Sequence, residues 1–176
     1  LVRALRCLDD PRQATLADTD TLLTATSLGE IDNAAQADAI DWSATAAALE
    51  ARHKMKAAPP TQSVQGGVQT PGNLLAQSHD PCLIRLRYHI ERAAHAFFSS
   101  SALEELPEPH PLRLYRPKQP MMHASWAIRG TAGTYHRSHV HAKGWYSGTC
   151  YVEVPDAVTG ENDAGYLVLG EPPFKV

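Results

Sequence analysis

The sequence predicts an α+β fold, in which N-terminal helices pack on a predominantly antiparallel sheet that curls into a double-stranded β-helix. Helical patterns come first along the chain, and several short segments with strand-like composition follow them. Five prolines between Leu106 and Pro120 exclude a long helix between these two regions. We predict a helical support region at 1–58 and a β-helix domain at 59–176, which includes a helix at 81–100.

The clearest helix signal is Asp80-Pro81, an acidic N-cap followed by proline at the first helical position. Apolar residues then recur at three- and four-residue steps and form one stripe: Leu83, Leu86, Ile90, Ala93, Ala94 and Phe97. We place His89 and His95 at the surface or boundary of this helix. A shorter helix is predicted from Ser43, as its N-cap, to Lys54.

Four strands are predicted in the C-terminal half, where apolar and aromatic residues lie between glycine-containing or polar turns. They are 121–128, the segment from Tyr135 through His141, 149–154 and 166–169. The helical patterns precede these segments, so we expect the helices to form a supporting layer on the sheet.

Composition excludes several classes of function. The formal net charge of the 176 residues is −3, which does not favour a nucleic-acid footprint. No apolar run approaches the length of a membrane span, and the first residues are too polar for a secretory signal. The three widely spaced cysteines argue against a disulfide framework or a Cys-based zinc site. We therefore expect a cytoplasmic protein with reduced thiols, no nucleic-acid partner and no membrane.

The segment His139-Val140-His141 is the candidate metal site. Alternate side chains of a strand share one face, so the two imidazoles would point the same way and could hold one ion. Imidazole suits Zn, Cu, Fe and Ni. On spacing alone this signal is weak, and the alternative is a polar strand face near a sheet edge. Flanking glycines and aromatics favour a pocket with a tight turn at its mouth.

Three blocks carry a resemblance to a known family. The stretch 133–155 reads Gly-Thr-Tyr-His-Arg-Ser-His-Val-His-Ala-Lys-Gly-Trp-Tyr-Ser-Gly-Thr-Cys-Tyr-Val-Glu-Val-Pro, and 62–75 reads Gln-Ser-Val-Gln-Gly-Gly-Val-Gln-Thr-Pro-Gly-Asn-Leu-Leu. The third block, 166–174, is a strand-like segment followed by an acidic-Pro turn. In this order they resemble the iron(II)/2-oxoglutarate-dependent oxygenases of the His-x-His, Trp-x-Ser-Gly type. The resemblance runs from Gln62 to the end of the chain.

The resemblance implies a jelly-roll or cupin-like core that uses Fe(II), with 2-oxoglutarate as co-substrate. His139 and His141 would be the metal ligands. Trp145 would wall the pocket, although packing on the sheet is the alternative for its side chain. Alternation with Thr149 along the predicted strand suggests that Tyr151 projects inward and hydrogen-bonds the co-substrate.

His141 takes the position where the wider fold has a carboxylate, so three ligand sets stay open. In the first set the metal ligands are all imidazoles. In the second a carboxylate from elsewhere in the protein completes the site, and in the third His141 lies near the metal without binding it. The distal histidine and the basic residue that grips 2-oxoglutarate normally lie on later strands. We therefore expect them beyond Val176, in a chain truncated at its C-terminus.

The leading hypothesis is an Fe(II)- and 2-oxoglutarate-dependent dioxygenase that hydroxylates an unknown small-molecule or protein substrate. One alternative is a non-catalytic binding module on a jelly-roll scaffold. The other is a different cupin-type metal enzyme, which would use the two histidines without 2-oxoglutarate. Fold alone does not separate them.

Overall fold

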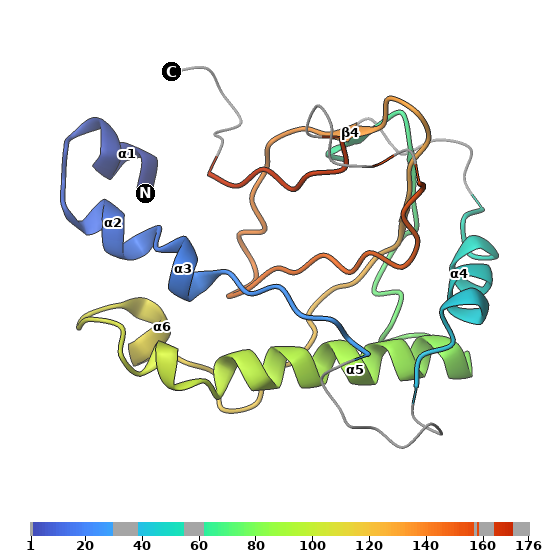
Figure 1. Ribbon diagram of the computed structural model, residues 1–176, viewed down its shortest axis with the longest axis horizontal. Coiled ribbons are helices and arrows are strands. Elements are labelled where there is room, and N and C mark those ends of the chain that lie inside the picture. Colours follow the sequence, from blue (N-terminus) through green and yellow to red (C-terminus); the bar gives the residue numbers. More distant parts are fainter. Residues whose placement is uncertain (1, 30–38, 55–61, 157, 159–163, 171–176) are drawn as a thin grey trace. The chain divides into compact units, whose positions relative to one another are not determined.

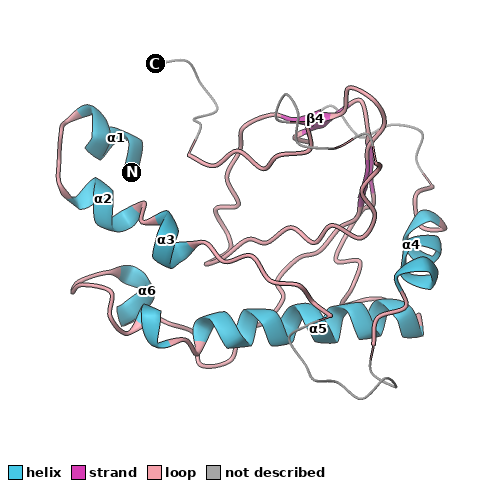
Figure 2. Cartoon of the chain, in the orientation of Figure 1, coloured by secondary structure: helices cyan, strands magenta, loops and turns pink. Residues whose placement is uncertain are grey.

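The computed structural model describes residues 2–29, 39–54, 62–156, 158 and 164–170. Figure 2 shows that these residues form helices joined by long loops, with few and short strands. The fold is therefore mixed, with more helix than sheet. In chain order the elements are α1 (Val2–Cys7), α2 (Arg12–Leu16), α3 (Thr19–Leu22), α4 (Trp42–Glu50), β1 (Val64–Gln65), β2 (Val68–Gln69), α5 (Pro81–Phe98), the 3-10 helix η2 (Ser101–Leu103), α6 (Pro111–Leu114), β3 (Ile128–Arg129) and β4 (Tyr135–His136).

The chain folds as two compact units. The first comprises Leu1–Ala39 and Arg87–Met122, and the second comprises Ile40–Leu86 and His123–Val176. The boundary at residues 86–87 falls within α5, the long helix labelled in Figure 1. The division of the chain into domains at residue 58 stays a prediction.

The first unit is stabilised by apolar side chains around short helices. Its buried residues include Leu5, Phe97, Phe98, Leu103 and Leu106. The rings of Phe97 and Phe98 meet edge to face, with centroids 5.3 Å apart, an arrangement that aromatic pairs favour.

The second unit contains all four strands that the described residues form. β1 pairs antiparallel with β4, and β2 pairs antiparallel with β3. Gly66, between β1 and β2, has a φ of 73°, a left-handed conformation that glycine adopts without a Cβ penalty. The chain can therefore turn sharply between the two short pairs.

The predicted sheet is much larger than the observed one. Of the predicted strand at 121–128 only Ile128 is in a strand, and the strand from Tyr135 ends at His136 rather than His141. No described residue of 149–154 or 166–169 is in a strand. Most of the described side chains in these two segments are exposed, and β-propensity without a paired, half-buried surface does not form a strand. The double-stranded β-helix is thus not seen in the described residues.

The predicted helix at 81–100 is confirmed as α5. Asp80 Oδ1 accepts a hydrogen bond of 3.0 Å from the Cys82 N–H, as expected of an N-cap. His95 is exposed as predicted, but the prediction for His89 is wrong, because this residue is buried with 2% of its surface exposed. His89 follows Leu86 by three residues, so it shares the inner face of the helix.

The predicted N-cap of α4 is wrong by two residues. Asp41 Oδ1 accepts a hydrogen bond of 2.9 Å from the Ala44 N–H, and the helix begins at Trp42. Ser43 is therefore inside the first turn. Both side chains are favoured N-caps, and an acidic residue here also interacts favourably with the helix dipole.

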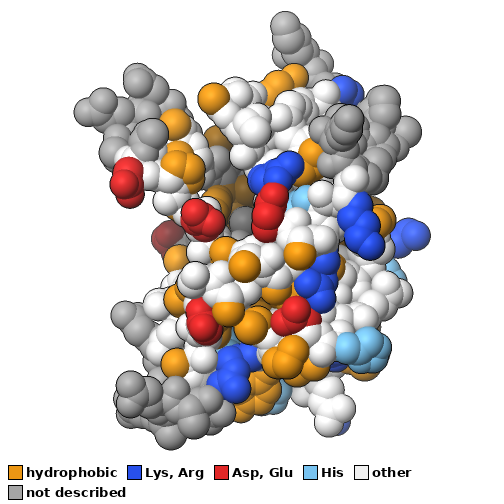
Figure 3. Space-filling model, turned by 90° about the vertical axis from the view of Figure 1, so that its right-hand side faces the viewer, with side chains coloured by type: hydrophobic (Ala, Val, Ile, Leu, Met, Phe, Trp, Pro, Cys, Tyr) orange, Lys and Arg blue, Asp and Glu red, His pale blue; other side chains and the backbone are white. Residues whose placement is uncertain are grey.

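The surface carries both signs of charge among exposed apolar side chains. The face shown in Figure 3 carries both Lys or Arg and Asp or Glu side chains, with hydrophobic side chains between them. No helix in the described part of the chain is both long enough and apolar enough to cross a membrane.

Candidate functional site

The site is built on two segments that are far apart in the sequence. Residues 62–75 run alongside residues 123–137 and are hydrogen-bonded to them beyond the four short strands. Arg137 N–H donates to the Ser63 carbonyl at 2.9 Å, and Thr70 N–H donates to the Ala127 carbonyl at 2.9 Å. Farther along, Leu74 N–H donates to the Ser125 carbonyl at 2.8 Å. These bonds hold the glutamine-rich segment against the segment that leads into the histidines.

Two small residues permit this close approach. Gly67 is buried, and a Cβ on it would lie 2.9 Å from the Arg129 carbonyl oxygen. Thr134 also lies next to Gly67, and its hydroxyl donates to the Gly66 carbonyl at 3.1 Å. Only glycine fits at position 67 without a shift of the backbone.

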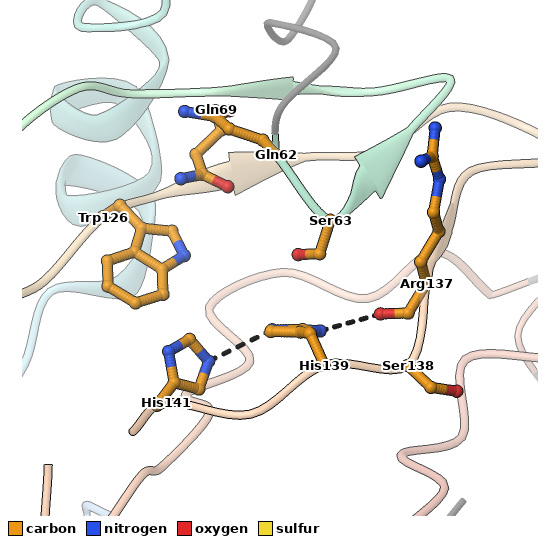
Figure 4. Close-up of a pocket in the computed structure, with 8 residues that line it drawn as sticks. All are labelled: Gln62, Ser63, Gln69, Trp126, Arg137, Ser138, His139 and His141. Carbon is orange, nitrogen blue, oxygen red and sulfur yellow. Dashed lines mark hydrogen bonds between the residues drawn. The ribbon is translucent and has the colours of Figure 1, made fainter. Parts of the chain in front are cut away.

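A cavity of about 400 Å³ lies in the second unit, a size that suits a small ligand or part of a larger one. Figure 4 shows Gln62, Gln69 and Ser63 on one side of it and the two histidines on the other, with Trp126 beside His141. Eight described residues line it: Gln62, Ser63, Gln69, Trp126, Arg137, Ser138, His139 and His141.

His139 and His141 face each other at the edge of this cavity. Their Nε2 atoms are 3.1 Å apart, and the ring centroids are 4.8 Å apart with the rings nearly perpendicular. Both residues lie in a loop after β4, so the loop conformation, and not a strand, brings the rings together. The indole of Trp126 lies against His141, with ring centroids 5.2 Å apart.

The other nitrogen of His139 is held by the backbone. His139 Nδ1 donates to the Arg137 carbonyl at 2.7 Å, the dashed line on the right of Figure 4. A carbonyl only accepts, so Nδ1 carries the proton and the neutral ring keeps its lone pair on Nε2. Metal-binding histidines are usually oriented by such a bond from the nitrogen that does not bind the metal.

The surroundings keep the neighbouring imidazoles neutral. Desolvation, and secondarily the nearby His139, lower the pKa of both His136 and His141 below the ordinary value. The ring of His136 stacks near that of His139, with centroids 6.2 Å apart. Its Nδ1 is 3.3 Å from the Ser63 hydroxyl. His136 therefore lies next to both Ser63 and His139.

The other two candidates lie away from the cavity. Trp145 and Tyr151 are each 56% exposed, and neither is among the residues that line it. The Tyr151 hydroxyl donates to the Gly165 carbonyl at 3.4 Å. Their roles in cofactor binding stay predictions. Six residues that line the cavity were not predicted as site residues: Gln62, Ser63, Gln69, Trp126, Arg137 and Ser138. The family resemblance of block 62–75 is the signal in the sequence that could have indicated the first three.

Residues 124–174 match the family model described as "Putative 2OG-Fe(II) oxygenase". The match includes the predicted histidine pair, Trp126 and the Trp-x-Ser-Gly segment, and it agrees with the family resemblance seen in the sequence. No curated protein matches the chain, and no solved structure does.

The name of this oxygenase family implies Fe(II) and 2-oxoglutarate, so the residues of the site can be tested for their fit to a metal. Two imidazole nitrogens bound at right angles to one metal, with bonds of roughly 2.1 Å, would be about 3 Å apart. The observed 3.1 Å matches this spacing and is also a hydrogen-bond distance between the two Nε2 atoms, and the tautomer of His139 leaves its Nε2 without a proton. Among the described residues, no group of three or more His, Cys, Asp or Glu side chains could hold an ion. The pair therefore fits as two ligands of an oxygenase metal, and the described residues supply no third.

Proposed function

We propose that this protein is an Fe(II)- and 2-oxoglutarate-dependent dioxygenase that hydroxylates an unknown substrate, with a double-stranded β-helix as its family fold. The observation that carries the proposal is the pair of Nε2 atoms at 3.1 Å, inside a segment that matches the oxygenase family model. The matched range contains both histidines, and the structure brings their rings together. His139 and His141 would hold the metal.

Bound Fe(II) would supply the redox chemistry, in which O2 gives one oxygen atom to the succinate formed as 2-oxoglutarate loses CO2, and the other to the hydroxylated substrate. The residues of this chain prepare the site. The Arg137 carbonyl holds the Nδ1 proton of His139, so that Nε2 faces the cavity as a ligand. Desolvation lowers the pKa of His141, which keeps this ring neutral and able to bind a metal near neutral pH. Trp126 covers one side of His141 and limits the access of water there.

One observation favours a second function, a non-catalytic binding module. The two histidines are exposed, and the described residues that line the cavity include no carboxylate. A facial triad needs a carboxylate besides its two histidines. A cavity of this size could bind a small molecule without any reaction.

The deciding experiment measures iron binding and 2-oxoglutarate turnover on anaerobically purified protein. We expect Fe(II) to bind by calorimetry, and succinate to form from 2-oxoglutarate once oxygen is admitted. Loss of an oriented second-shell partner alone costs about 10- to 100-fold in metal affinity, so His139→Ala and His141→Ala should each cost at least that much.

The control is His79→Ala, which removes an exposed imidazole of the same unit that does not line the cavity. It should bind Fe(II) like the wild type. Iron binding without succinate formation would favour a metal enzyme of another kind. If neither iron binding nor succinate is detected, the binding module is the better description.

A further inference from the structure

The wall opposite the histidine pair consists of uncharged hydrogen-bonding groups. Gln62 and Gln69 contribute carboxamides, and Trp126 contributes an indole N–H. Within the described residues, Gln62 Oε1 has no hydrogen-bond partner, and neither the Gln69 amide nor Trp126 Nε1 bonds to another side chain. Polar groups at the rim of a core are normally paired with protein, water or a ligand. The Gln69 carboxamide and the Trp126 indole N–H therefore have hydrogen-bonding capacity available for a ligand, and Gln62 Oε1 is a buried acceptor without a partner among the described residues.

The charge of the cavity restricts what that ligand can be. None of the described residues that line the cavity is acidic, so the ammonium or guanidinium group of a ligand would meet no carboxylate there. Arg137 also lines the cavity, but its guanidinium donates to Gln65 Oε1 at 2.9 Å and points away from His139 in Figure 4. Before a metal is bound, an anionic substrate group at the glutamine wall would thus have no cation directed at it. A neutral, polar ligand loses the least hydration energy on entering such a site.

We propose that the wall formed by Gln62, Gln69 and Trp126 binds a neutral carboxamide of a polypeptide substrate, next to the histidine pair. A glutamine side chain offers one donor and one acceptor side by side, and an amide offers the complementary pair. The two groups can form two hydrogen bonds at once, whereas a single hydroxyl cannot match both atoms in that geometry. The amide is an asparagine or glutamine side chain, or a peptide group.

The shape of the site favours a segment of a chain over an enclosed small molecule. Four of the residues that line the cavity are exposed: Trp126, Arg137, His139 and His141. Pockets for small molecules usually bury most of their ligand. An open cavity with a polar wall suits a peptide that passes across it and inserts one amide. This inference rests on the proposed function, because it names the substrate class of that same site.

The test is an NMR titration of the full 176-residue chain without metal, which keeps it independent of iron chemistry. The probe is N-acetylglutamine methylamide, and N-acetylglutamate methylamide is the matched anion of the same shape. The signals are the Trp126 indole N–H, assigned with Trp126→Phe, and the side-chain amides of Gln62 and Gln69. We expect the amide probe to shift these signals and to bind at least about tenfold more tightly than the anion.

Two variants locate the binding to the wall. Gln69→Glu keeps the shape and removes the amide donors, so it should weaken binding of the amide probe roughly tenfold. Gln77→Glu makes the same change at an exposed glutamine of the same unit outside the cavity, and should leave binding unchanged. Gln62→Glu repeats the test from the other side of the wall if Gln69→Glu does not fold.

Three results would overturn the inference. They are tighter binding of the anion, tighter binding of methyl glucoside added as a neutral polyhydroxyl probe, and equal binding by wild type and both wall variants. The metal experiment above is separate, so intact Fe(II) binding with no amide binding would reject the substrate class alone. Loss of Fe(II) binding with intact amide binding would reject the oxygenase instead.

Discussion

The hydroxyl oxygen of Thr70 accepts a hydrogen bond of 2.9 Å from the backbone N–H of Ala127, and Thr70 N–H donates to the Ala127 carbonyl at the same distance. Thr70 is buried, with 2% of its surface exposed. Thr70 directly follows Gln69, and Ala127 directly follows Trp126, so the bonds join the chain next to two residues of the cavity wall. A buried threonine thus fixes the register in which the two segments of the site meet.

Replacing Thr70 by valine should weaken this junction. Thr70→Val keeps the volume but removes the acceptor, which leaves the partly buried Ala127 N–H without its partner. We expect the free energy of unfolding to fall by about 1 kcal/mol in urea denaturation. Thr149→Val, at an exposed position, is the control and should change it little. Equal stability of the two variants would show that the hydroxyl does not hold the junction.

Gly67→Ala tests the close approach of the same segments. The new Cβ would meet the Arg129 backbone oxygen at 2.9 Å and the Thr134 methyl carbon at 3.0 Å. The Thr134 side chain can move, but the Arg129 carbonyl cannot do so without disturbing the β2–β3 pair. We therefore expect the free energy of unfolding to fall by about 1–3 kcal/mol, measured by thermal or urea unfolding. Gly148→Ala meets nothing within 4 Å and serves as the control. A wild-type stability for Gly67→Ala would contradict the packing described above.

Asp41 and Ser43 offer a matched pair at the start of α4. Asp41→Ala removes the side chain that caps the Ala44 N–H, and should cost about 1 kcal/mol in the free energy of unfolding. Ser43→Ala removes a hydroxyl within the first turn and should be close to neutral. If Ser43→Ala lowered the free energy of unfolding more than Asp41→Ala in urea denaturation, Ser43 would be the N-cap, as predicted from the sequence.

His110 should make the first unit less stable in acid. It caps α6 by accepting a hydrogen bond at Nδ1 from the Leu112 N–H at 3.2 Å, and it is buried. Burial lowers its pKa below the ordinary 6.5, against a smaller opposing effect of Asp18. The unfolded chain therefore takes up the proton first as the pH falls through 6.5, and protonation would also turn the accepting nitrogen into a donor.

The measurement compares wild type with His110→Asn from about pH 7.5 down to about pH 5.5. Asparagine retains a capping acceptor but does not titrate. We expect the wild type to lose stability relative to the variant by at most about 1.4 kcal/mol per pH unit, in urea denaturation. If the stabilities of the two proteins fell in parallel as the pH was lowered, His110 would be excluded as the source of the lost stability. The comparison also cancels the contributions of His53 and His136, whose pKa values are lowered too.

Local patterns predicted those parts of the molecule that depend on neighbours in the sequence. Asp80-Pro81 and the apolar stripe after it predicted α5, because capping and helical periodicity act within a few residues. The same argument misplaced the cap of α4, where Asp41 and Ser43 are both good candidates and the geometry of the preceding turn selects one. It also missed the burial of His89, since histidine is found both inside and outside protein cores.

By itself the sequence determined the long helix, the family resemblance and the pairing of His139 with His141 as a candidate, because each is encoded in a short run of residues. Tertiary structure alone decided that residues 62–75 lie against 123–137, and so which neutral side chains face the histidines. It also decided that β-prone residues at 149–154 form no strand. Pairing of distant segments depends on closing a long loop and burying both partners, and composition does not specify which partners meet.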